Sequence, residues 1–123
     1  MNSKPSLKPI LSVDLRKNRI RIHKQTLHMM GDPEYIQLLV NPDTHIIAVR
    51  KSIREDFLAH KVSKAQLTSK NCYELYSKIL VGQLCKVNSD WDSNETYRIY
   101  GELHPEQGIA SFDMTETVLL TKQ

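Results

Sequence analysis

The sequence predicts an α+β fold with a β-rich N-terminal half, in which two hairpins flank a short helix, and a C-terminal helix followed by an antiparallel hairpin. Three observations support this class: alternating apolar residues near the N-terminus, later changes to helical spacing, and turn residues between apolar runs. The chain has 123 residues, of which 40% are hydrophobic and 25% charged, which suits one packed domain. We therefore expect a flexible arm at residues 1–9 and a single domain at 10–123, with a basic half at 10–51 and an acidic half at 52–123.

The first predicted hairpin joins two segments in which apolar residues alternate, ILSVDL (10–15) and RIRI (19–22). A two-residue turn at Lys17-Asn18 would place Leu15 opposite Ile20 and bring every apolar side chain to one face. Asn18 tolerates the left-handed backbone that such a turn requires. The apolar face would then pack on the core.

A short helix and a second hairpin are predicted next. From Lys24 the apolar spacing changes to three, which indicates a helix over Lys24–Met30, and Gly31 is a typical helix stop. The following apolar runs, YIQLLV and HIIAV, flank an Asn-Pro-Asp-Thr sequence at 41–44 that suits a type I turn. Because both strands are apolar on both faces, we expect this hairpin to be covered on each side.

Two capping patterns predict helices in the second half. Ser52 with Glu55 indicates a short helix around Arg54–His60, followed by a polar connector at 61–70. Asn71, with Glu74 three residues later, indicates the start of a longer helix. Six residues would form its apolar stripe: Cys72, Leu75, Tyr76, Ile79, Leu80 and Leu84.

The C-terminal segment predicts a loop and a last hairpin. VNSDWDSNE (87–95) has loop composition, and the strands YRIYGEL and GIASFDM flank a turn at 104–107. TVLL (117–120) would add an edge strand. The aromatic residues gather in this acidic half, where Trp91 stands between two aspartates. Simple packing in the core would explain these aromatic side chains, and contact with another protein is the alternative, because acid-flanked aromatics do not suit single-stranded nucleic acid.

Charge is divided unevenly along the chain, whose net charge is +3. Residues 1–70 hold 13 Lys and Arg against 6 Asp and Glu, a net +7, whereas residues 71–123 hold 4 against 8, a net −4. A basic half suggests an anionic partner such as nucleic acid. Attraction between the halves of a dimer, or a solvated surface without a partner, would give the same split.

The first hairpin would place its cations on the outward face. In the predicted register Arg16 lies opposite Arg19, and Arg21 follows on the same face. Three like charges on one sheet face are destabilising unless an anion meets them. The pattern therefore suits nucleic acid or another anionic ligand, but edge strands also use such cations to resist aggregation.

Residues 10–50 resemble the swapped-hairpin DNA-binding domains of the SpoVT/AbrB type. Those domains commonly contain Lys-Gly-Arg-hydrophobic-x-hydrophobic-Pro and then a short helix that ends in a Leu-Gly-like pair. Lys17–His23 is similar to the first part, and Met30-Gly31 to the end of the helix. Asn18 replaces the glycine, His23 replaces the proline, and Thr26-Leu27 reverses the usual hydrophobic-then-arginine order.

The resemblance implies a homodimer with interleaved hairpins that regulates transcription by binding double-stranded DNA. Arg19 and Lys17 match the basic residues of the family, and three neighbours are added by charge alone: Arg16, Arg21 and Lys24. The competing hypothesis is a non-enzymatic protein-binding or structural accessory domain that uses residues 71–120 and does not contact nucleic acid.

Motifs for catalysis or metal binding are missing from the sequence. It has no phosphate-binding loop or nucleophile elbow, and the five histidines do not have ligand spacing. Cys72 and Cys85 fit buried free thiols in a reducing cytosol. No apolar run approaches 18 residues, and the N-terminus lacks a signal-like segment. We therefore expect a cytoplasmic protein that is not an enzyme, crosses no membrane, and uses no metal or cofactor.

Overall fold

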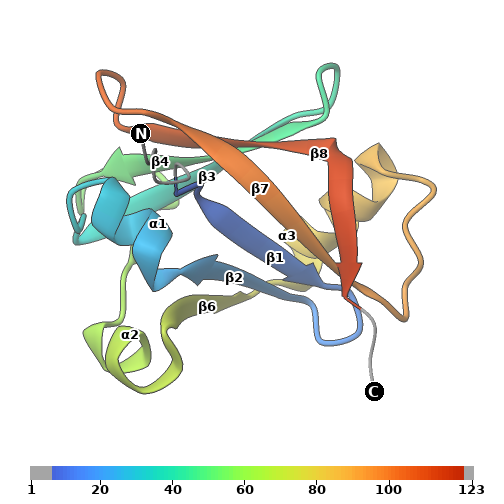
Figure 1. Ribbon diagram of the computed structural model, residues 1–123, viewed down its shortest axis with the longest axis horizontal. Coiled ribbons are helices and arrows are strands. Elements are labelled where there is room, and N and C mark those ends of the chain that lie inside the picture. The colour runs from blue at the N-terminus through green and yellow to red at the C-terminus, as the bar shows by residue number, and fades with distance from the viewer. Residues whose placement is uncertain (1–6, 121–123) are drawn as a thin grey trace, which may run out of the picture.

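Eight antiparallel strands form one sheet that curls into a half-barrel, and three short helices accompany it (Figure 1). The structure is a computed structural model that describes residues 7–120. The predicted α+β class is confirmed. Across the sheet the strand order is β5-β3-β4-β8-β7-β1-β2-β6. The strands are β1 Ile10–Asp14, β2 Arg19–His23, β3 Tyr35–Asn41, β4 Ile46–Ser52, β5 His60–Lys61, β6 Cys72–Tyr76, β7 Thr96–His104 and β8 Ile109–Leu120; the helices are α1 Lys24–Met29, α2 Lys64–Lys70 and α3 Lys78–Val87.

β1 and β2 form the predicted hairpin, but in a different register. Val13 lies opposite Ile20, so the predicted pairing of Leu15 with Ile20 is wrong by two residues. A shift of two keeps every apolar side chain on the same face, because side chains alternate with a period of two. It also brings Asp14, and not Arg16, opposite Arg19.

A local hydrogen-bond pattern explains the longer turn of this hairpin. Asp14 Oδ1 accepts hydrogen bonds from the backbone N–H of Arg16 at 3.1 Å and of Lys17 at 3.4 Å. Aspartate commonly closes turns in this way. Asn18 adopts the left-handed backbone expected of it, with φ of 51°.

The next elements are close to their predicted positions. α1 ends as expected before Gly31, which has φ of 90°, and β3 pairs with β4 over seven residues. Asn41 Oδ1 accepts hydrogen bonds from the N–H groups of Asp43 and Thr44 in the turn. The expectation that this hairpin is covered on both sides is wrong, because Leu39 on the second face is 40% exposed.

The region 52–70 differs from its prediction. Residues 53–59 form turns and not a helix, because Asp56 Oδ2 accepts hydrogen bonds from Ser52 Oγ at 2.7 Å and from the N–H of Ile53 at 3.2 Å. The predicted polar connector contains β5 and α2. Ser63 provides the N-cap of α2 by accepting a hydrogen bond from the N–H of Gln66.

The helix predicted from Asn71 begins later, after Ser77. Ser77 Oγ accepts a hydrogen bond from the N–H of Leu80, whereas Asn71 has φ of 58° and ends α2. The residues between them form β6, which pairs with β2 along its whole length. This pairing buries Tyr73 and Glu74, and tertiary contacts therefore override the local capping pattern.

The last hairpin is confirmed, but its second strand is longer than predicted. The TVLL segment is not a separate edge strand, because it forms the end of β8 and pairs with the start of β7. The register between β7 and β8 shifts between Ile99 and Gly101. In Figure 1, β8 bends sharply: its first half lies between β4 and β7, and its second half pairs with the start of β7.

The core lies on one face of the curled sheet and combines strands from both halves of the chain. The residues with no exposed surface include Leu11, Val13, Ile20, Ile22, Ile36, Ile47, Val49, Leu84, Ile99 and Phe112. Most of the predicted arm at 1–9 lies outside the described residues. Within the described part, Pro9 is buried, and its carbonyl accepts a hydrogen bond from the N–H of Gly101 at 2.8 Å. Among the helices of residues 7–120, none is long and apolar enough to cross a membrane.

Candidate functional site

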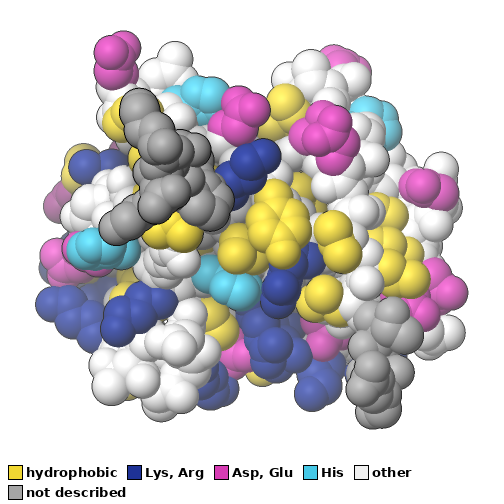
Figure 2. Space-filling view, viewed as in Figure 1, with side chains coloured by type: hydrophobic (Ala, Val, Ile, Leu, Met, Phe, Trp, Pro, Cys, Tyr) yellow, Lys and Arg dark blue, Asp and Glu magenta, His cyan; other side chains and the backbone are white. Residues whose placement is uncertain are grey.

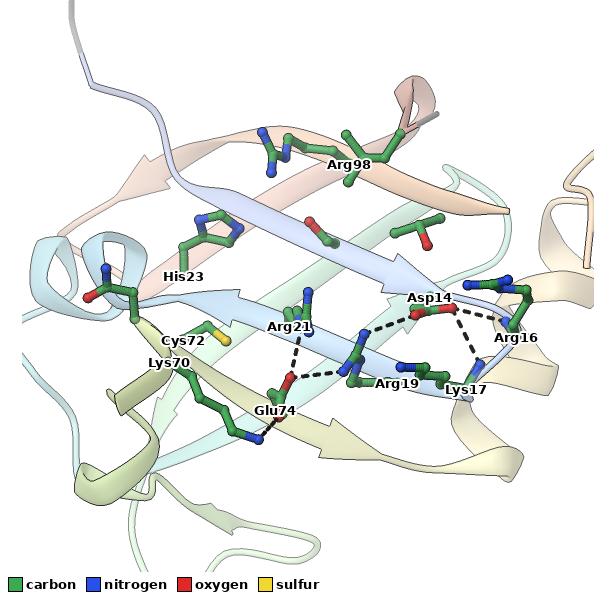
Figure 3. Close-up of a pocket in the computed structure, with 14 residues that line it drawn as sticks. Asp14, Arg16, Lys17, Arg19, Arg21, His23, Lys70, Cys72, Glu74 and Arg98 are labelled. Carbon is green, nitrogen blue, oxygen red and sulfur yellow. Dashed lines mark hydrogen bonds and ion pairs between the residues drawn. The ribbon is translucent and has the colours of Figure 1, made fainter. Parts of the chain in front are cut away.

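A hollow of about 840 Å³ lies on the face of the sheet that is turned away from the core (Figure 3). Alternate residues of four adjacent strands line it, together with the turn after β1 and the ends of α2 and β8. The lining residues are Ser12, Asp14, Arg16, Lys17, Arg19, Arg21, His23, Lys70, Asn71, Cys72, Glu74, Thr96, Arg98 and Leu120. Six of them are Lys or Arg and two are carboxylates, a net charge of +4. We call this feature the cationic hollow.

Strand pairing arranges the side chains of the hollow in rows. Ser12 on β1 lies opposite Arg21 on β2 and opposite Arg98 on β7, and Arg21 lies opposite Glu74 on β6. Neighbouring strands are about 4.8 Å apart. Long side chains of one row therefore reach one another. Figure 2 shows Lys and Arg side chains gathered near the centre of this face, below a group of hydrophobic side chains.

Glu74 is the centre of an ion-pair network in the hollow. It is 4% exposed, and its Oε2 accepts hydrogen bonds from Arg19 Nη1 at 3.1 Å and Arg21 Nε at 2.9 Å. Its Oε1 accepts one from Lys70 Nζ at 2.7 Å. The hydrogen bond from Lys70 lowers the pKa of Glu74, and Arg21 lowers it further although burial opposes both. Glu74 is therefore ionised at neutral pH.

Arg19 is buried between two carboxylates. Besides Glu74, its guanidinium contacts Asp14, with 3.0 Å from Nη2 to Oδ2, and the residue is 9% exposed. Arg19 and Arg21 lie on the outward face as predicted, but the expectation that they lack counter-charges within the chain is wrong for both. Their charges are matched by the two carboxylates, one of which belongs to the acidic half of the chain.

The hollow contains four of the five residues that the sequence suggested for nucleic-acid binding: Arg16, Lys17, Arg19 and Arg21. Lys24 is not among its lining residues. That residue begins α1 and lines a separate depression with His23 and His28.

Two cations of the hollow were missed by sequence reasoning, Lys70 and Arg98. Arg98 lies in the half with negative net charge, and Lys70 in the segment predicted as a connector. Alternation with Tyr97 and Ile99 places Arg98 on the outer face of its strand. However, no local signal identifies β1 as its neighbour.

Two polar groups at the middle of the row have unmet hydrogen-bonding capacity. Ser12 is 4% exposed, and its Oγ has no hydrogen-bond partner within residues 7–120. Arg98 forms no ion pair with any described residue, and its buried Nε also lacks a partner. Beside them, burial lowers the pKa of His23, and the charges of Arg98 and Arg21 lower it further. His23 is therefore neutral near pH 7.

Two exposed tyrosines share the face of the cationic hollow. Tyr76 lies opposite Arg19 and is 58% exposed, and Tyr100 lies opposite Ile10 and is 45% exposed. Tyr97 points to the other face of β7, where its ring stacks on Trp91 with 4.7 Å between centroids. The aromatic residues of the acidic half therefore divide between packing and the cationic face, and the prediction that Tyr76 belongs to an apolar helical stripe is wrong.

Charged and hydrogen-bonding side chains predominate in the lining of the hollow. Among the described residues, no group of three His, Cys, Asp or Glu side chains is placed to hold a metal ion. Both cysteines are free thiols, and burial raises the pKa of Cys72, so it is protonated at neutral pH. An array of guanidinium, ammonium and hydroxyl donors is suited to bind an anion with several acceptor oxygens.

No protein-family model, curated protein or solved structure matches this chain. The resemblance of residues 10–50 to SpoVT/AbrB domains therefore remains a prediction from local pattern. Both edges of the β1–β2 hairpin are paired within the chain, with β7 on one side and β6 on the other. β8 and β7 separate this hairpin from the β3–β4 hairpin in the sheet.

Proposed function

We propose that this chain is a non-enzymatic domain that binds nucleic acid through the cationic hollow. The observation that supports this most strongly is the concentration of six cations against two carboxylates on one sheet face. Three of these cations, Arg16, Lys17 and Arg98, form no ion pair with any residue of 7–120. Phosphate groups provide the counter-charge that they lack, and such contacts dominate affinity for nucleic acid.

Single strands are the preferred form of the ligand. The cations line a hollow, and the exposed rings of Tyr76 and Tyr100 lie on the same face. Single-strand binding proteins combine a positively charged groove with aromatic side chains on which bases stack. The transcription regulator predicted from the family resemblance would instead bind duplex DNA, with Arg16 and Lys17 at the turn as its contacts.

The test compares oligonucleotides of equal length, single-stranded and duplex, by fluorescence anisotropy over a range of salt concentrations. We expect single strands to bind more tightly, with affinity that falls as salt rises by a log–log slope of about −0.7 per phosphate neutralised. Tighter binding of the duplex would support the regulator hypothesis. Lack of salt-dependent binding by either form would refute the proposal.

A pair of matched double variants tests the location of the binding face. Lys17→Gln with Arg98→Gln removes two unpaired cations of the hollow. We expect the log–log slope of single-strand affinity against salt concentration to become less negative by about 1.4. Arg54→Gln with Lys86→Gln removes the same two residue types from exposed positions outside the hollow. Equal loss of affinity in both double variants would mean that binding follows net charge and not this face.

A second candidate function, a protein-binding accessory domain, is supported by an apolar groove elsewhere on the molecule. The groove has a volume of about 520 Å³ and lies between β3, the 57–58 turn and the start of α3. Phe57 is 83% exposed there and Ile79 is 80% exposed. Exposed apolar patches of this kind often mark protein contacts. Phe57→Ser with Ile79→Ser would abolish a protein contact at this groove and leave oligonucleotide binding unchanged.

A further inference from the structure

Ser12 is buried at the base of the cationic hollow with a hydroxyl group that nothing in the described residues satisfies. An unpaired polar group in such a position is costly, because it has lost its hydrogen bonds to water without replacement. Arg98 lies directly opposite Ser12 on β7, and its buried Nε also lacks a hydrogen-bond partner among the described residues. Two unmet donors on facing residues indicate a missing acceptor between them.

The surroundings of Ser12 define the chemistry of that acceptor. The short serine side chain lies between two arginines on the adjacent strands, Arg98 and Arg21. Arg21 uses Nε for Glu74, so its terminal nitrogens are available. Glu74 already accepts from three cations, and the neighbouring His23 is neutral. The row therefore offers a ligand the unpaired guanidinium of Arg98, the terminal nitrogens of Arg21, whose Nε is paired with Glu74, and a hydroxyl group.

We propose that Arg98, Ser12 and Arg21 form a binding site for one phosphate monoester group. Such a group is a dianion near neutral pH with three strong acceptor oxygens, which matches two guanidinium groups and one hydroxyl. The inference deepens the proposed function, because it assigns one defined phosphate to the middle of the hollow.

The size of the hollow leaves space for the remainder of a larger ligand. Its volume of about 840 Å³ exceeds what a phosphate group fills, and Arg16 and Lys17 extend the cationic lining toward the turn after β1. A phosphate monoester occurs in a free nucleotide and also at the phosphorylated end of a nucleic-acid strand. The chemistry of recognition is the same in the two cases.

Inorganic phosphate is the first probe, measured by isothermal titration calorimetry on the full chain against sodium chloride at matched ionic strength. We expect Ser12→Ala to weaken phosphate binding about tenfold, the loss of one hydrogen bond to a charged group, and Arg98→Gln to weaken it at least as much. Arg54→Gln, an exposed arginine outside the hollow, should bind as the wild type does.

Ser12→Ala keeps this test decisive because it removes an unsatisfied hydroxyl group and leaves every charge in place. We expect its melting temperature in chloride buffer to equal or exceed that of the wild type. A folded Ser12→Ala variant that binds phosphate as tightly as the wild type would overturn the proposal. Absence of any phosphate binding by the wild type would overturn it as well.

Oligonucleotides with and without a 5′ phosphate, together with adenosine monophosphate, separate the two sources of the phosphate. A preference of about tenfold or more for the phosphorylated strand, lost in Ser12→Ala, supports a strand end as ligand. Binding of the mononucleotide as tightly as the phosphorylated strand supports a free nucleotide.

The same measurements distinguish failure of this site from failure of the proposed function. Equal binding of both oligonucleotides, without binding of inorganic phosphate, would overturn the phosphate site and leave nucleic-acid binding in place. Binding of phosphate without any oligonucleotide binding would support the site and refute the nucleic-acid function.

Discussion

One carboxylate, Glu74, forms ion pairs with three cations that come from two different elements. Arg19 and Arg21 belong to β2, and Lys70 belongs to α2. Without Glu74, Arg19 would be a buried guanidinium with Asp14 as its remaining ion-pair partner among the described residues. A buried charge without adequate compensation is strongly destabilising. The network therefore contributes to the stability of the paired strands β2 and β6.

Glu74→Gln should lower the free energy of unfolding by about 3 kcal/mol, because it removes the charge of a buried ion-pair partner. Urea denaturation measures this loss. Glu106→Gln, an exposed carboxylate in the turn between β7 and β8, is the matched control and should change stability by less than about 0.5 kcal/mol. Equal stability of the two variants would contradict the structural role assigned to Glu74.

The same network makes stability depend on pH in the acid range. The pKa of Glu74 is lowered from its ordinary value of 4.5 by the hydrogen bond from Lys70 and the charge of Arg21. At low pH the unfolded chain therefore binds more protons than the folded one. The contribution of Glu74 is complete above pH 4.5 and is lost as pH falls through the lower folded pKa. The stability difference between wild type and Glu74→Gln should shrink over that range.

For single residues, the sequence predicted which cations line the hollow better than it predicted the residues that pair with them. Four of the five residues suggested for nucleic-acid binding line the hollow, because alternation along a strand fixes which face a side chain occupies. Glu74 was interpreted as part of a helix cap, and Arg98 received no role. Each belongs to a strand that also pairs with a strand distant in sequence, β6 with β2 and β7 with β1, and local patterns do not specify such pairings.

At the scale of elements, Gly101 marks the point where β7 changes register against β8. A Cβ atom at this position would lie 2.3 Å from the carbonyl oxygen of Ser111 and 2.6 Å from Cδ1 of Phe112. The N–H of Gly101 also donates a hydrogen bond to the carbonyl of Pro9. The close approach of two backbones at the bend therefore requires a residue without a side chain.

Gly101→Ala should destabilise the fold by about 1–3 kcal/mol, the usual cost of forcing extra atoms into a packed site. Gly82→Ala is the control, because a Cβ there meets nothing within 4 Å and the residue lies inside α3. We expect it to stabilise the protein by up to about 1 kcal/mol. Thermal denaturation of both variants tests the comparison, and a stable Gly101→Ala variant would show that the bend tolerates a side chain.

Hairpins were easier to predict than helices in this chain. The three hairpins are local, and the turn residues between their apolar runs are visible in the sequence. The capping patterns at Ser52 and Asn71 failed because the same polar side chains also stabilise turns and helix ends. In one case Asp56 closes a turn, and in the other Asn71 adopts a left-handed backbone that ends α2.

In the whole molecule, strands from the basic half of the chain lie next to strands from the acidic half. β1 and β2, from the basic half, lie between β7 and β6 from the acidic half, and β4 borders β8. The hollow likewise combines Arg21 with Glu74 and Arg98. The charge division along the sequence is therefore not a division of the surface. This arrangement was not accessible from sequence, because it depends on long-range strand pairing.

A fragment of residues 1–55 should therefore be unfolded by itself. It retains the β1–β2 and β3–β4 hairpins but lacks β6, β7 and β8, which pair with them in the sheet. Isolated two-stranded hairpins are marginally stable at best. Circular dichroism and size-exclusion chromatography measure the outcome. A folded dimer of this fragment would contradict the integrated sheet and favour interleaved hairpins of the SpoVT/AbrB type.

The position of β1 in the sheet has a consequence for the way the protein is made. Val13 pairs with Tyr97, which follows 84 positions later in the chain. During translation β1 and β2 leave the ribosome long before their outer partners are synthesised. The apolar side of the hairpin stays open to solvent throughout that interval. We therefore expect slow post-translational folding and dependence on chaperones, as contact order predicts for sheets closed by distant segments.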